Sequence, residues 1–328
     1  MTTHQRIVLA ARPRGSVLPE HLRLETVETP APGEGQVLVR NHYLSLDPYM
    51  RGRMSDAKSY ATAQALNDTM IGGTAGEVLE SRHPDFVPGD KVVGLLGWTE
   101  MGVADGAELR KVDAKAAPLS AYLGVLGMPG VTAWYGINQI MLPVEGETVL
   151  VSAASGAVGS AVGQLAKRRG CRVVGIAGGP GKCAYVVNEL GFDACVDYKA
   201  GNLAADLAAA APDGIDALFE NVGGAGFDAA LPLMNAFGRI ALCGLIAGYN
   251  GDKLAVTNMR FLLTSRLSLR GFIITEHMDI WPQALQELAA GKIKYRETVA
   301  VGLAAAPEAF IGLLNGRNFG KQLVNLIP

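Results

Sequence analysis

Two glycines near the middle of the chain stand at a spacing that suits phosphate binding. Residues 148–154 form an apolar, β-branched run, Gly156 and Gly159 follow it, and a stretch typical of a helix comes next. In a GxGxxG register Ala154 replaces the first glycine, Gly156 lets the backbone approach a pyrophosphate, and Gly159 lets the helix pack against the strand. Backbone N–H groups at the helix start would hold the phosphate charge. We therefore predict a dinucleotide-binding loop made of Gly156, Ala157, Val158 and Gly159.

The next expected strand indicates which dinucleotide is used. Enzymes that use NAD place an Asp or Glu about 20 residues after the glycines, where it holds the ribose 2′-hydroxyl. Here the segment 172–177 is followed by Gly178 and Gly179 without an acid, and Lys182 comes shortly after. The charge of a lysine at this point could meet a 2′-phosphate. The sequence therefore favours NADPH; the alternative is that Lys182 is only a solvated residue of the first helical turn.

Alternating strand and helix patterns surround this loop. Short β-branched runs alternate with longer Ala/Leu-rich stretches, which is typical of βα units and a parallel sheet. The expected strands are 148–154, 172–177, 194–198, 215–221, 239–244 and 267–275, and the expected helices are 157–169, 182–190, 203–211, 227–235 and 281–290. Six parallel strands would form a doubly wound α/β domain of the Rossmann type.

The segments on either side of this region predict a second domain. Strand-like runs at 36–43 and 91–96 are separated by Gly/Pro turn clusters, which favours a mainly antiparallel β domain. The tail after residue 298 returns to short strands around one helix at 307–314, so we expect it to complete the N-terminal domain. The expected domains are residues 1–123 with 299–328, and residues 124–298 inserted between these two pieces.

Composition and charge exclude several classes of protein. The 328 residues are 49% hydrophobic and carry 29 Lys and Arg against 31 Asp and Glu, so we expect no nucleic-acid partner. The N-terminus lacks the uninterrupted apolar core of a secretory signal, and the longest apolar region, 119–144, is interrupted by Gly and Pro. We therefore expect a cytoplasmic protein without a membrane span.

The four cysteines, Cys171, Cys183, Cys195 and Cys243, show no CxxC spacing. This argues against a zinc knuckle or a thioredoxin-type motif. Because Cys171, Cys195 and Cys243 have strand-like neighbours, we interpret them as small core residues in a reducing compartment.

Several strings spread over the whole chain resemble one family. They are YLSLDPYMRGRM at 43–54, GVLGMPG at 124–130, the glycine loop, ENVGG at 220–224 and NFGK at 318–321. In these the chain resembles the zinc-independent medium-chain reductases, in the branch of the prostaglandin, 2-alkenal and curcumin reductases. The resemblance implies a GroES-like fold for the N-terminal domain and an active site in the cleft between the domains. Zinc-dependent relatives need a GHExxG cluster, and no histidine of this chain is so placed, so no catalytic metal is implied.

Matching positions imply the cofactor contacts. Lys182 and Tyr198 would contact the 2′-phosphate beside Gly178, and Asn221 and Asn318 would lie along the cofactor. The residues that would wall the nicotinamide are Cys243, Gly244, Leu245 and Tyr249, together with the strand residues Phe272, Ile273 and Ile274. Two alternatives stay open: Asn221 could end its strand with a bond from its side chain to the backbone, and 272–274 could be ordinary sheet core.

The family chemistry implied is reduction of the C=C bond of an α,β-unsaturated ketone or aldehyde by hydride transfer to the β-carbon. Negative charge then develops on the carbonyl oxygen and needs a hydrogen-bond donor, which a tyrosine hydroxyl supplies at neutral pH. We predict Tyr249 as this catalytic donor and Tyr49 as a residue that shapes the substrate site; for each, a buried aromatic wall is the alternative. Many family members carry a proline-rich loop where this chain has residues 251–257, so the substrate's size and identity stay open.

Two other functions fit the same sequence. A quinone reductase of the same superfamily shares the fold, the cofactor and the absence of zinc. A non-enzymatic NADPH-binding protein could use the Rossmann domain as a redox sensor.

The apolar strand expected at 267–275 bears on assembly. At the edge of the sheet it could pair with its copy across a two-fold axis, and an exposed edge is a liability unless it is covered. We therefore expect a homodimer.

Overall fold

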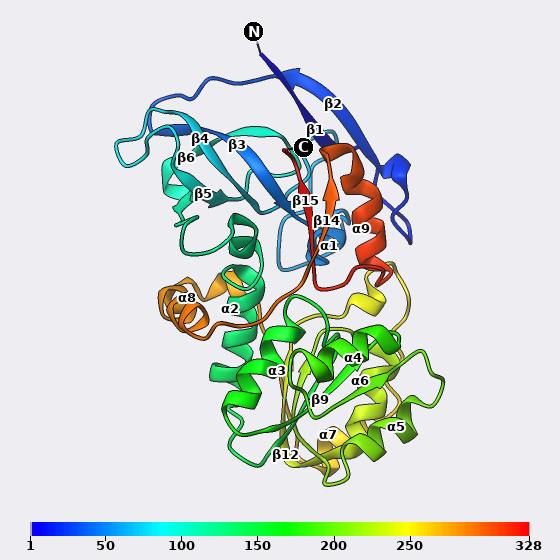
Figure 1. Ribbon diagram of the computed structural model, residues 1–328. Coiled ribbons are helices and arrows are strands. Elements are labelled where there is room, and N and C mark those ends of the chain that lie inside the picture. The colour runs from blue at the N-terminus through cyan, green and yellow to red at the C-terminus, as the bar shows by residue number, and fades with distance from the viewer. Residues whose placement is uncertain (1, 328) are drawn as a thin grey trace. The chain divides into compact units, whose positions relative to one another are not determined.

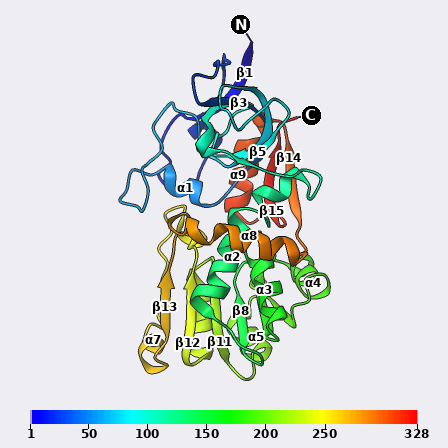
Figure 2. The same cartoon turned by 90° about the vertical axis from the view of Figure 1, so that its left-hand side faces the viewer.

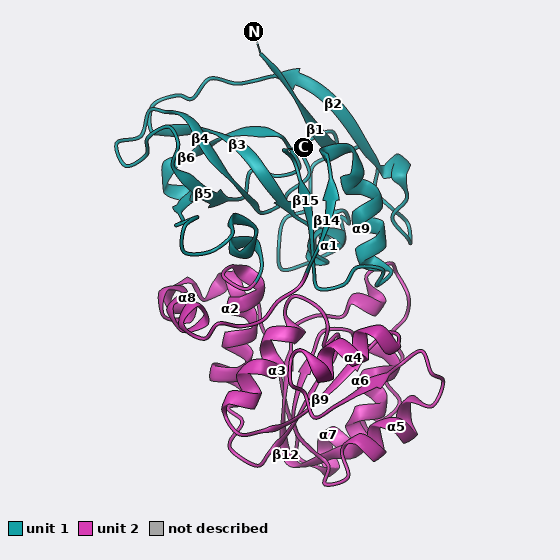
Figure 3. Ribbon diagram, viewed as in Figure 1, with its two compact units in different colours: residues 1–124, 297–328 teal, residues 125–296 magenta. Residues whose placement is uncertain are grey.

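The alternating segments in the second half of the chain fold into one parallel sheet in the computed structural model, which describes residues 2–327 (Figure 1). The chain divides into two compact units, one of residues 125–296 and one of residues 1–124 and 297–328 (Figure 3). We refer to them as the Rossmann unit and the β unit. The sequence suggested breaks after residues 123 and 298.

The sheet of the Rossmann unit has six strands in the order β10-β9-β8-β11-β12-β13, and every pairing is parallel. Numbered along the chain, this is the order 3-2-1-4-5-6 of dinucleotide-binding domains, in which ligands bind beyond the carboxyl ends of the strands where the order reverses. That point lies between β8 and β11. The strands are β8 Thr148–Val151, β9 Arg172–Ala177, β10 Ala194–Asp197, β11 Ile215–Glu220, β12 Met234–Leu242 and β13 Ser268–Gly271.

Helices follow these strands and cover the sheet. Leu150 of β8 and Leu218 of β11 belong to one buried cluster with Leu207 of α5 and Phe227 of α6. The helix α4 begins at Pro180, a residue suited to a first turn because it has no N–H group to satisfy. The helices of this unit are α2 Met128–Tyr135, α3 Gly159–Arg168, α4 Pro180–Asn188, α5 Leu203–Ala210, α6 Gly224–Ala230, α7 Arg260–Thr264 and α8 Trp281–Ala290.

The helix α8 lies beside α2 in both views of the molecule (Figures 1 and 2). The indole nitrogen Nε1 of Trp134 donates a hydrogen bond of 2.7 Å to Oε2 of Glu287. This bond links the two helices and gives the indole N–H, which is largely removed from water, a partner.

The β unit is built around β3, Gln36–Ser45, which pairs with β4, β6 and β15. Its main sheet runs β14-β15-β3-β4-β5-β7, and only β14 and β15 are parallel. The C-terminal strand β15 therefore completes the N-terminal sheet. The remaining elements are β1 Thr3–Leu9, β2 Leu22–Glu28, α1 Tyr49–Arg53, β4 Thr74–Ser81, β5 Lys91–Gly94, β6 Met101–Asp105, β7 Arg110–Lys111, β14 Glu297–Val301, α9 Ala306–Leu314 and β15 Lys321–Asn325.

The predicted fold class is confirmed: a doubly wound parallel sheet is inserted in the chain of a mainly antiparallel β unit. Short 3-10 helices lie at Pro19–His21, Gly106–Glu108, Leu119–Leu123, Leu231–Leu233, Ile246–Gly248, Ile274–Glu276, Met278–Ile280 and Leu303–Ala305, and a π-helical turn at Gly136–Met141.

Several element predictions were wrong in extent: the strand expected at 148–154 ends at Val151, the strand expected at 239–244 spans Met234–Leu242, and a helix and a further strand also differ. The helix expected at 227–235 ends at Ala230, and β12 already begins at Met234. The strand expected at 267–275 is only Ser268–Gly271, because Gly271 pairs with Leu242, the last residue of β12, and the ladder stops where its partner ends. Phe272 and Ile273 therefore follow the strand, and Ile274 begins a 3-10 helix.

Candidate functional site

The glycine loop leads from the end of β8 into α3. A Cβ atom built on Gly159 would lie 2.4 Å from the carbonyl oxygen of Ala153, so no side chain fits there without displacing the turn. A Cβ atom on Gly156 would lie 3.1 Å from the same oxygen. The geometry supports the interpretation that Gly159 allows the start of α3 to pack closely on the turn. The loop lies at the carboxyl end of β8, where the strand order reverses.

The ends of β9 and β10 form the part of the site expected to meet the ribose. The ring of Tyr198 covers Gly178, because a Cβ atom on Gly178 would lie 2.8 Å from the ring carbon Cε1. Gly179 has a φ of 97°, and its N–H group donates a 2.7 Å bond to Oδ1 of Asp197. This bond fixes the turn that carries Lys182 on the first turn of α4.

Two lysines, Lys182 and Lys199, lie near one another beyond the ends of β9 and β10. Partial burial lowers the pKa of Lys182, and the positive charge of Lys199 lowers it further. The ammonium nitrogen of Lys199 lies 5.8 Å from the centroid of the Tyr198 ring. Like charges held near one another favour an anion between them. The predicted residues Gly178 and Tyr198 thus lie in contact, and Lys199 lies near both the ring of Tyr198 and the predicted Lys182. The sequence signal for Lys199 was a cation directly after Tyr198 at the end of a strand.

A buried carboxylate joins the strand ends on the other side of the glycine loop. Glu220, the last residue of β11, is 1% exposed, and its Oε1 accepts bonds from Ser152 Oγ at 2.9 Å and from the N–H groups of Val222 and Gly223 at 2.6 and 2.7 Å. Burial raises the pKa of Glu220, and these donors oppose that rise. We did not predict Glu220, because a lone acid at the end of an apolar strand gives no sign in sequence of what it binds.

Asn221 bonds to the neighbouring strand end. Its Nδ2 donates to the carbonyl oxygen of Ser152 at 2.8 Å, and its backbone N–H donates to Ser152 Oγ at 2.7 Å. The side chain of Asn221 therefore bonds to the backbone, as in the alternative interpretation, but to the backbone of the neighbouring strand's end. Asn221 therefore holds the exits of β8 and β11 together beside the glycine loop.

The loop after β12 brings together the other residues expected around the nicotinamide. The N–H group of Cys243 donates to the carbonyl oxygen of Glu220 at 2.8 Å. Burial raises the pKa of the Cys243 thiol to about 12, with the nearby Glu220 adding to the rise. The hydroxyl oxygen of Tyr249 would lie 3.3 Å from a Cβ atom on Gly244 and accepts the Leu245 N–H at 3.4 Å. Tyr249 thus folds back on the start of its own loop.

Phe272, Ile273 and Ile274 do not form the strand that we expected. The ring of Phe272 lies 5.2 Å from that of Tyr135 and 6.3 Å from that of Phe219, measured between centroids. Phe272 therefore packs among aromatic rings of α2 and β11, and Ile274 is buried at the start of a 3-10 helix.

The β unit carries Tyr49 and Asn318. Tyr49 is the first residue of α1 and packs against the core cluster that contains Trp98 and Phe310. Burial raises its pKa well above the ordinary value, and the charge of Asp47 adds to the rise, so the hydroxyl keeps its proton at neutral pH. The Nδ2 of Asn318 donates to the carbonyl oxygen of Gly320 at 2.7 Å, just before β15.

A buried ion pair fixes the segment that leads to Tyr49. Lys321 of β15 donates from Nζ to Oδ1 of Asp47 at 2.6 Å and to the carbonyl oxygen of Leu46 at 2.8 Å. The hydroxyl of Ser45 is bonded to the other carboxylate oxygen of Asp47. The side chains of Lys321 and Asp47 are 4% and 9% exposed, so removing either charge leaves the other buried without its partner.

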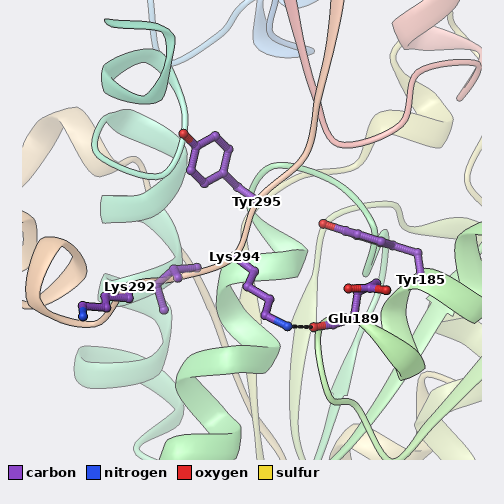
Figure 4. Close-up of a pocket in the computed structure, with 6 residues that line it drawn as sticks. Tyr185, Glu189, Lys292, Lys294 and Tyr295 are labelled. Carbon is purple, nitrogen blue, oxygen red and sulfur yellow. Dashed lines mark hydrogen bonds between the residues drawn. The ribbon is translucent and has the colours of Figure 1, made fainter. Parts of the chain in front are cut away.

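A hollow of about 440 Å³ lies elsewhere in the Rossmann unit (Figure 4). It is lined by Tyr185 of α4, by Glu189 directly after that helix and by the segment 292–295. The ammonium group of Lys294 donates to the carbonyl oxygen of Glu189 at 3.0 Å, as the dashed line in Figure 4 marks. None of the lining residues is one that we expected in the cofactor site.

Two family models match the chain. One, described as the N-terminal domain of oxidoreductase, covers residues 5–112, and the other, described as zinc-binding dehydrogenase, covers residues 157–290. In residues 2–327 there is no group of three or more His, Cys, Asp or Glu side chains arranged to hold a metal ion. Although the second model is described as zinc-binding, residues 2–327 therefore contain no cluster of zinc ligands. Every helix within the same range is too short or too polar to cross a lipid bilayer.

Individual proteins are similar over the whole length. The NADPH-dependent curcumin reductase of Escherichia coli (strain K12) is 47% identical over 98% of this chain and 97% of its own. The 2-alkenal reductase (NADP(+)-dependent) of Nicotiana tabacum is 45% identical over 89% and 88%. The crystal structure of CurA from Vibrio vulnificus in complex with NADPH is 46% identical, with a TM-score of 0.94 over 99% of each chain.

The sheet order, the glycine loop and these matches define the class, which is that of the medium-chain dehydrogenases and reductases. Within it, the chain belongs to the zinc-independent branch of the curcumin, 2-alkenal and prostaglandin reductases.

Lys182 and Lys199 lead to a prediction about cofactor choice. We expect Lys182→Ala to raise the KM for NADPH by about tenfold or more, because a charge-assisted bond to phosphate contributes roughly 1.5–3 kcal/mol. The KM for NADH should change little. Steady-state kinetics with both cofactors measure this, with exposed Lys115→Ala as the control. Equal losses for NADPH and NADH would contradict the assignment of Lys182.

The buried ion pair leads to a prediction about stability. We expect Lys321→Met to lower the free energy of unfolding by about 3–5 kcal/mol, because the Asp47 carboxylate would stay buried without its partner. Adding Asp47→Asn should restore most of that loss in denaturant unfolding. Arg317→Ala is the matched control, since the Arg317–Glu308 pair is 62% and 67% exposed and should contribute about 0–1 kcal/mol. A double variant as unstable as Lys321→Met would refute this account.

Proposed function

We propose that this protein reduces the C=C bond of α,β-unsaturated ketones and aldehydes with NADPH. The observation that carries the proposal is that Lys182 lies near Lys199, which itself lies near the ring of Tyr198, on a sheet of the dinucleotide-binding order. A pair of cations at the expected ribose end suits a 2′-phosphate. The relatives are named as NADPH-dependent or NADP(+)-dependent reductases of curcumin and of 2-alkenals, which supports both the cofactor and the substrate class.

The residues present fit this cofactor. Gly159 leaves room for the close start of α3, and the loop Gly156–Gly159 would hold the pyrophosphate at a helix N-terminus. Lys182, Lys199, Tyr198 and Gly178 would hold the 2′-phosphate. Asn221 and Asn318 would lie along the cofactor. The residues that would surround the nicotinamide are Cys243, Gly244, Leu245 and Tyr249, together with the segment Phe272, Ile273 and Ile274. When bound, NADPH supplies the hydride that the β-carbon of the substrate accepts.

Tyr249 is the residue that we propose to act on the substrate. As hydride reaches the β-carbon, electron density moves to the carbonyl oxygen, and a hydroxyl aimed at that oxygen would stabilise the developing charge. The contact of Tyr249 with Gly244 and Leu245, in the loop after β12, supports this role. Water would supply the proton of the α-carbon, since we assign no acid of this chain to that step. Tyr49, which retains its proton, would shape the substrate site.

We expect Tyr249→Phe to lower kcat by about a hundredfold or more, because that is the usual loss when one donor to an oxyanion is removed. The KM for NADPH should change less than about twofold, since the ring remains. NADPH consumption with a linear α,β-unsaturated ketone measures both constants. Tyr60→Phe, which removes a hydroxyl from a 57% exposed residue, is the matched control.

The product decides the reaction class. A saturated ketone, identified by mass spectrometry, is the expected product, and a matched assay with a quinone tests the competing reaction. Faster NADPH consumption with the quinone and no saturated ketone would replace our proposal by a quinone reductase. An unchanged kcat of Tyr249→Phe would remove that tyrosine from the mechanism.

We also propose that the protein works in the cytoplasm as a homodimer. Its four cysteines are free thiols, which suits a reducing compartment. The strand β13 is the last strand of the sheet and is exposed along its length, so pairing with its copy would cover an open edge. Light scattering should give twice the chain mass of 34.4 kDa, and a single-chain mass would refute the dimer.

A further inference from the structure

Two cysteines that are far apart in sequence meet beside the expected 2′-phosphate site. Cys183 lies in the first half of α4 and Cys195 lies on β10, the edge strand of the sheet. Their Sγ atoms are 2.9 Å apart, and both residues are partly exposed. We had interpreted Cys171, Cys195 and Cys243 as core residues: Cys171 is buried, whereas Cys195 and Cys243 keep part of their surface exposed although burial raises the pKa of both thiols.

We propose that Cys183 and Cys195 form a reversible disulfide when the protein meets a peroxide, and that this disulfide weakens the binding of NADPH. The second half of the proposal rests on the proposed function, whereas the first half stands on the thiols alone. Disulfides inside cells are usually transient and act in catalysis or in redox sensing, so a pair placed at a cofactor site suits regulation.

The hydrogen bond between the two thiols indicates which cysteine reacts first with the peroxide. The Cys195 thiol donates its hydrogen bond to Cys183 Sγ, and this bond favours Cys183 as the thiolate. Burial raises the pKa of both thiols, and the backbone of Ala177 opposes that rise for both. The thiolate is the reactive form, so Cys183 is the nucleophile and Cys195 the resolving thiol.

The chemistry balances with hydrogen peroxide as the oxidant. The Cys183 thiolate attacks one peroxide oxygen, an S–O bond forms, the O–O bond breaks, and the departing hydroxide takes a proton to become water. Cys195 then attacks the resulting sulfenic sulfur; the S–S bond forms, and the S–O oxygen leaves as a second water. Two thiols are oxidised and one peroxide is reduced to two waters.

The position of the pair connects it to the cofactor site. Cys183 directly follows Lys182, and Cys195 lies two residues before Asp197, which holds the Gly179 N–H group at 2.7 Å. A disulfide bond is about 2.05 Å long, so the two sulfurs must move closer by less than an ångström. Such a movement shifts either the turn that carries Lys182 or the strand that leads to Tyr198.

The far end of α4 is held in place. Lys294 donates to the carbonyl oxygen of Glu189, and the guanidinium of Arg296 lies 5.9 Å from the centroid of the Tyr185 ring (Figure 4 draws the Lys294 contact). With this end anchored, the movement falls on the first turn of α4. Lys182 then leaves its position near Lys199, so we infer weaker NADPH binding in the oxidised protein.

Peptide mapping of the full-length protein tests the disulfide. After treatment with hydrogen peroxide and digestion without reductant, we expect a peptide that links Cys183 to Cys195, and loss of two of the four free thiols, both reversed by dithiothreitol. In Cys195→Ser the link cannot form, and dimedone should trap Cys183 as the sulfenic acid. Oxidation of the thiols without the Cys183–Cys195 link would overturn the proposal.

NADPH titration tests the coupling. Dissociation constants from the change in NADPH fluorescence should rise about fivefold or more on oxidation of the native chain and stay constant in Cys195→Ser. A linked protein with unchanged NADPH affinity would overturn the regulatory half. The reduced protein serves as the reference: if it prefers NADH, the proposed function fails, while the peptide map still decides whether the thiol pair reacts.

Discussion

The carboxylate of Glu220 is the constraint on which the exit side of the Rossmann sheet depends. A carboxyl group removed from water is costly unless donors surround it, and Ser152 and the N–H groups of Val222 and Gly223 meet that need at Oε1, whereas the buried Oε2 has no partner among the described residues. Each of these donors belongs to a turn that leaves β8 or β11. One buried group therefore fixes both turns, and its backbone carbonyl also takes the Cys243 N–H group after β12.

This arrangement explains how flexible-looking loops can form a defined binding surface. The exits of β8, β11 and β12 are glycine-rich, and glycine alone would leave them many conformations. Hydrogen bonds from Asn221 to Ser152 connect the end of β11 to the end of β8. Gly244, after β12, lies close to both the carbonyl oxygen of Asn221 and the hydroxyl of Tyr249. Preorganised polar groups of this kind are what an electrostatically assisted hydride transfer requires.

The sequence predicted those features that depend on neighbours along the chain. The apolar run before the glycine loop, the helix after it and the missing acid after β9 are all local, and the doubly wound parallel sheet that the alternating strands and helices predict was confirmed. What the sequence could not supply depends on contacts across the sheet. The end of β13 is set by the last residue of β12, and Lys199 becomes part of the site only because β10 pairs with β9. The meeting of Cys183 with Cys195 has the same origin.

The charges at the proposed ribose end show how this candidate site differs from one for NAD. An acid at the end of β9 would accept a ribose hydroxyl, and this chain has none there. An acid does occur at the end of β10, but Oδ1 of Asp197 accepts the N–H groups of Gly179 and Lys199 at 2.7 and 3.0 Å, and these bonds lower its pKa. Asp197 therefore acts on the backbone of the turn. The charges of Lys182, Lys199 and Asp197 sum to one positive charge, which suits an anion. The turn after β9 thus lacks an acid of its own for the ribose, and the acid that fixes its backbone belongs to the neighbouring strand β10.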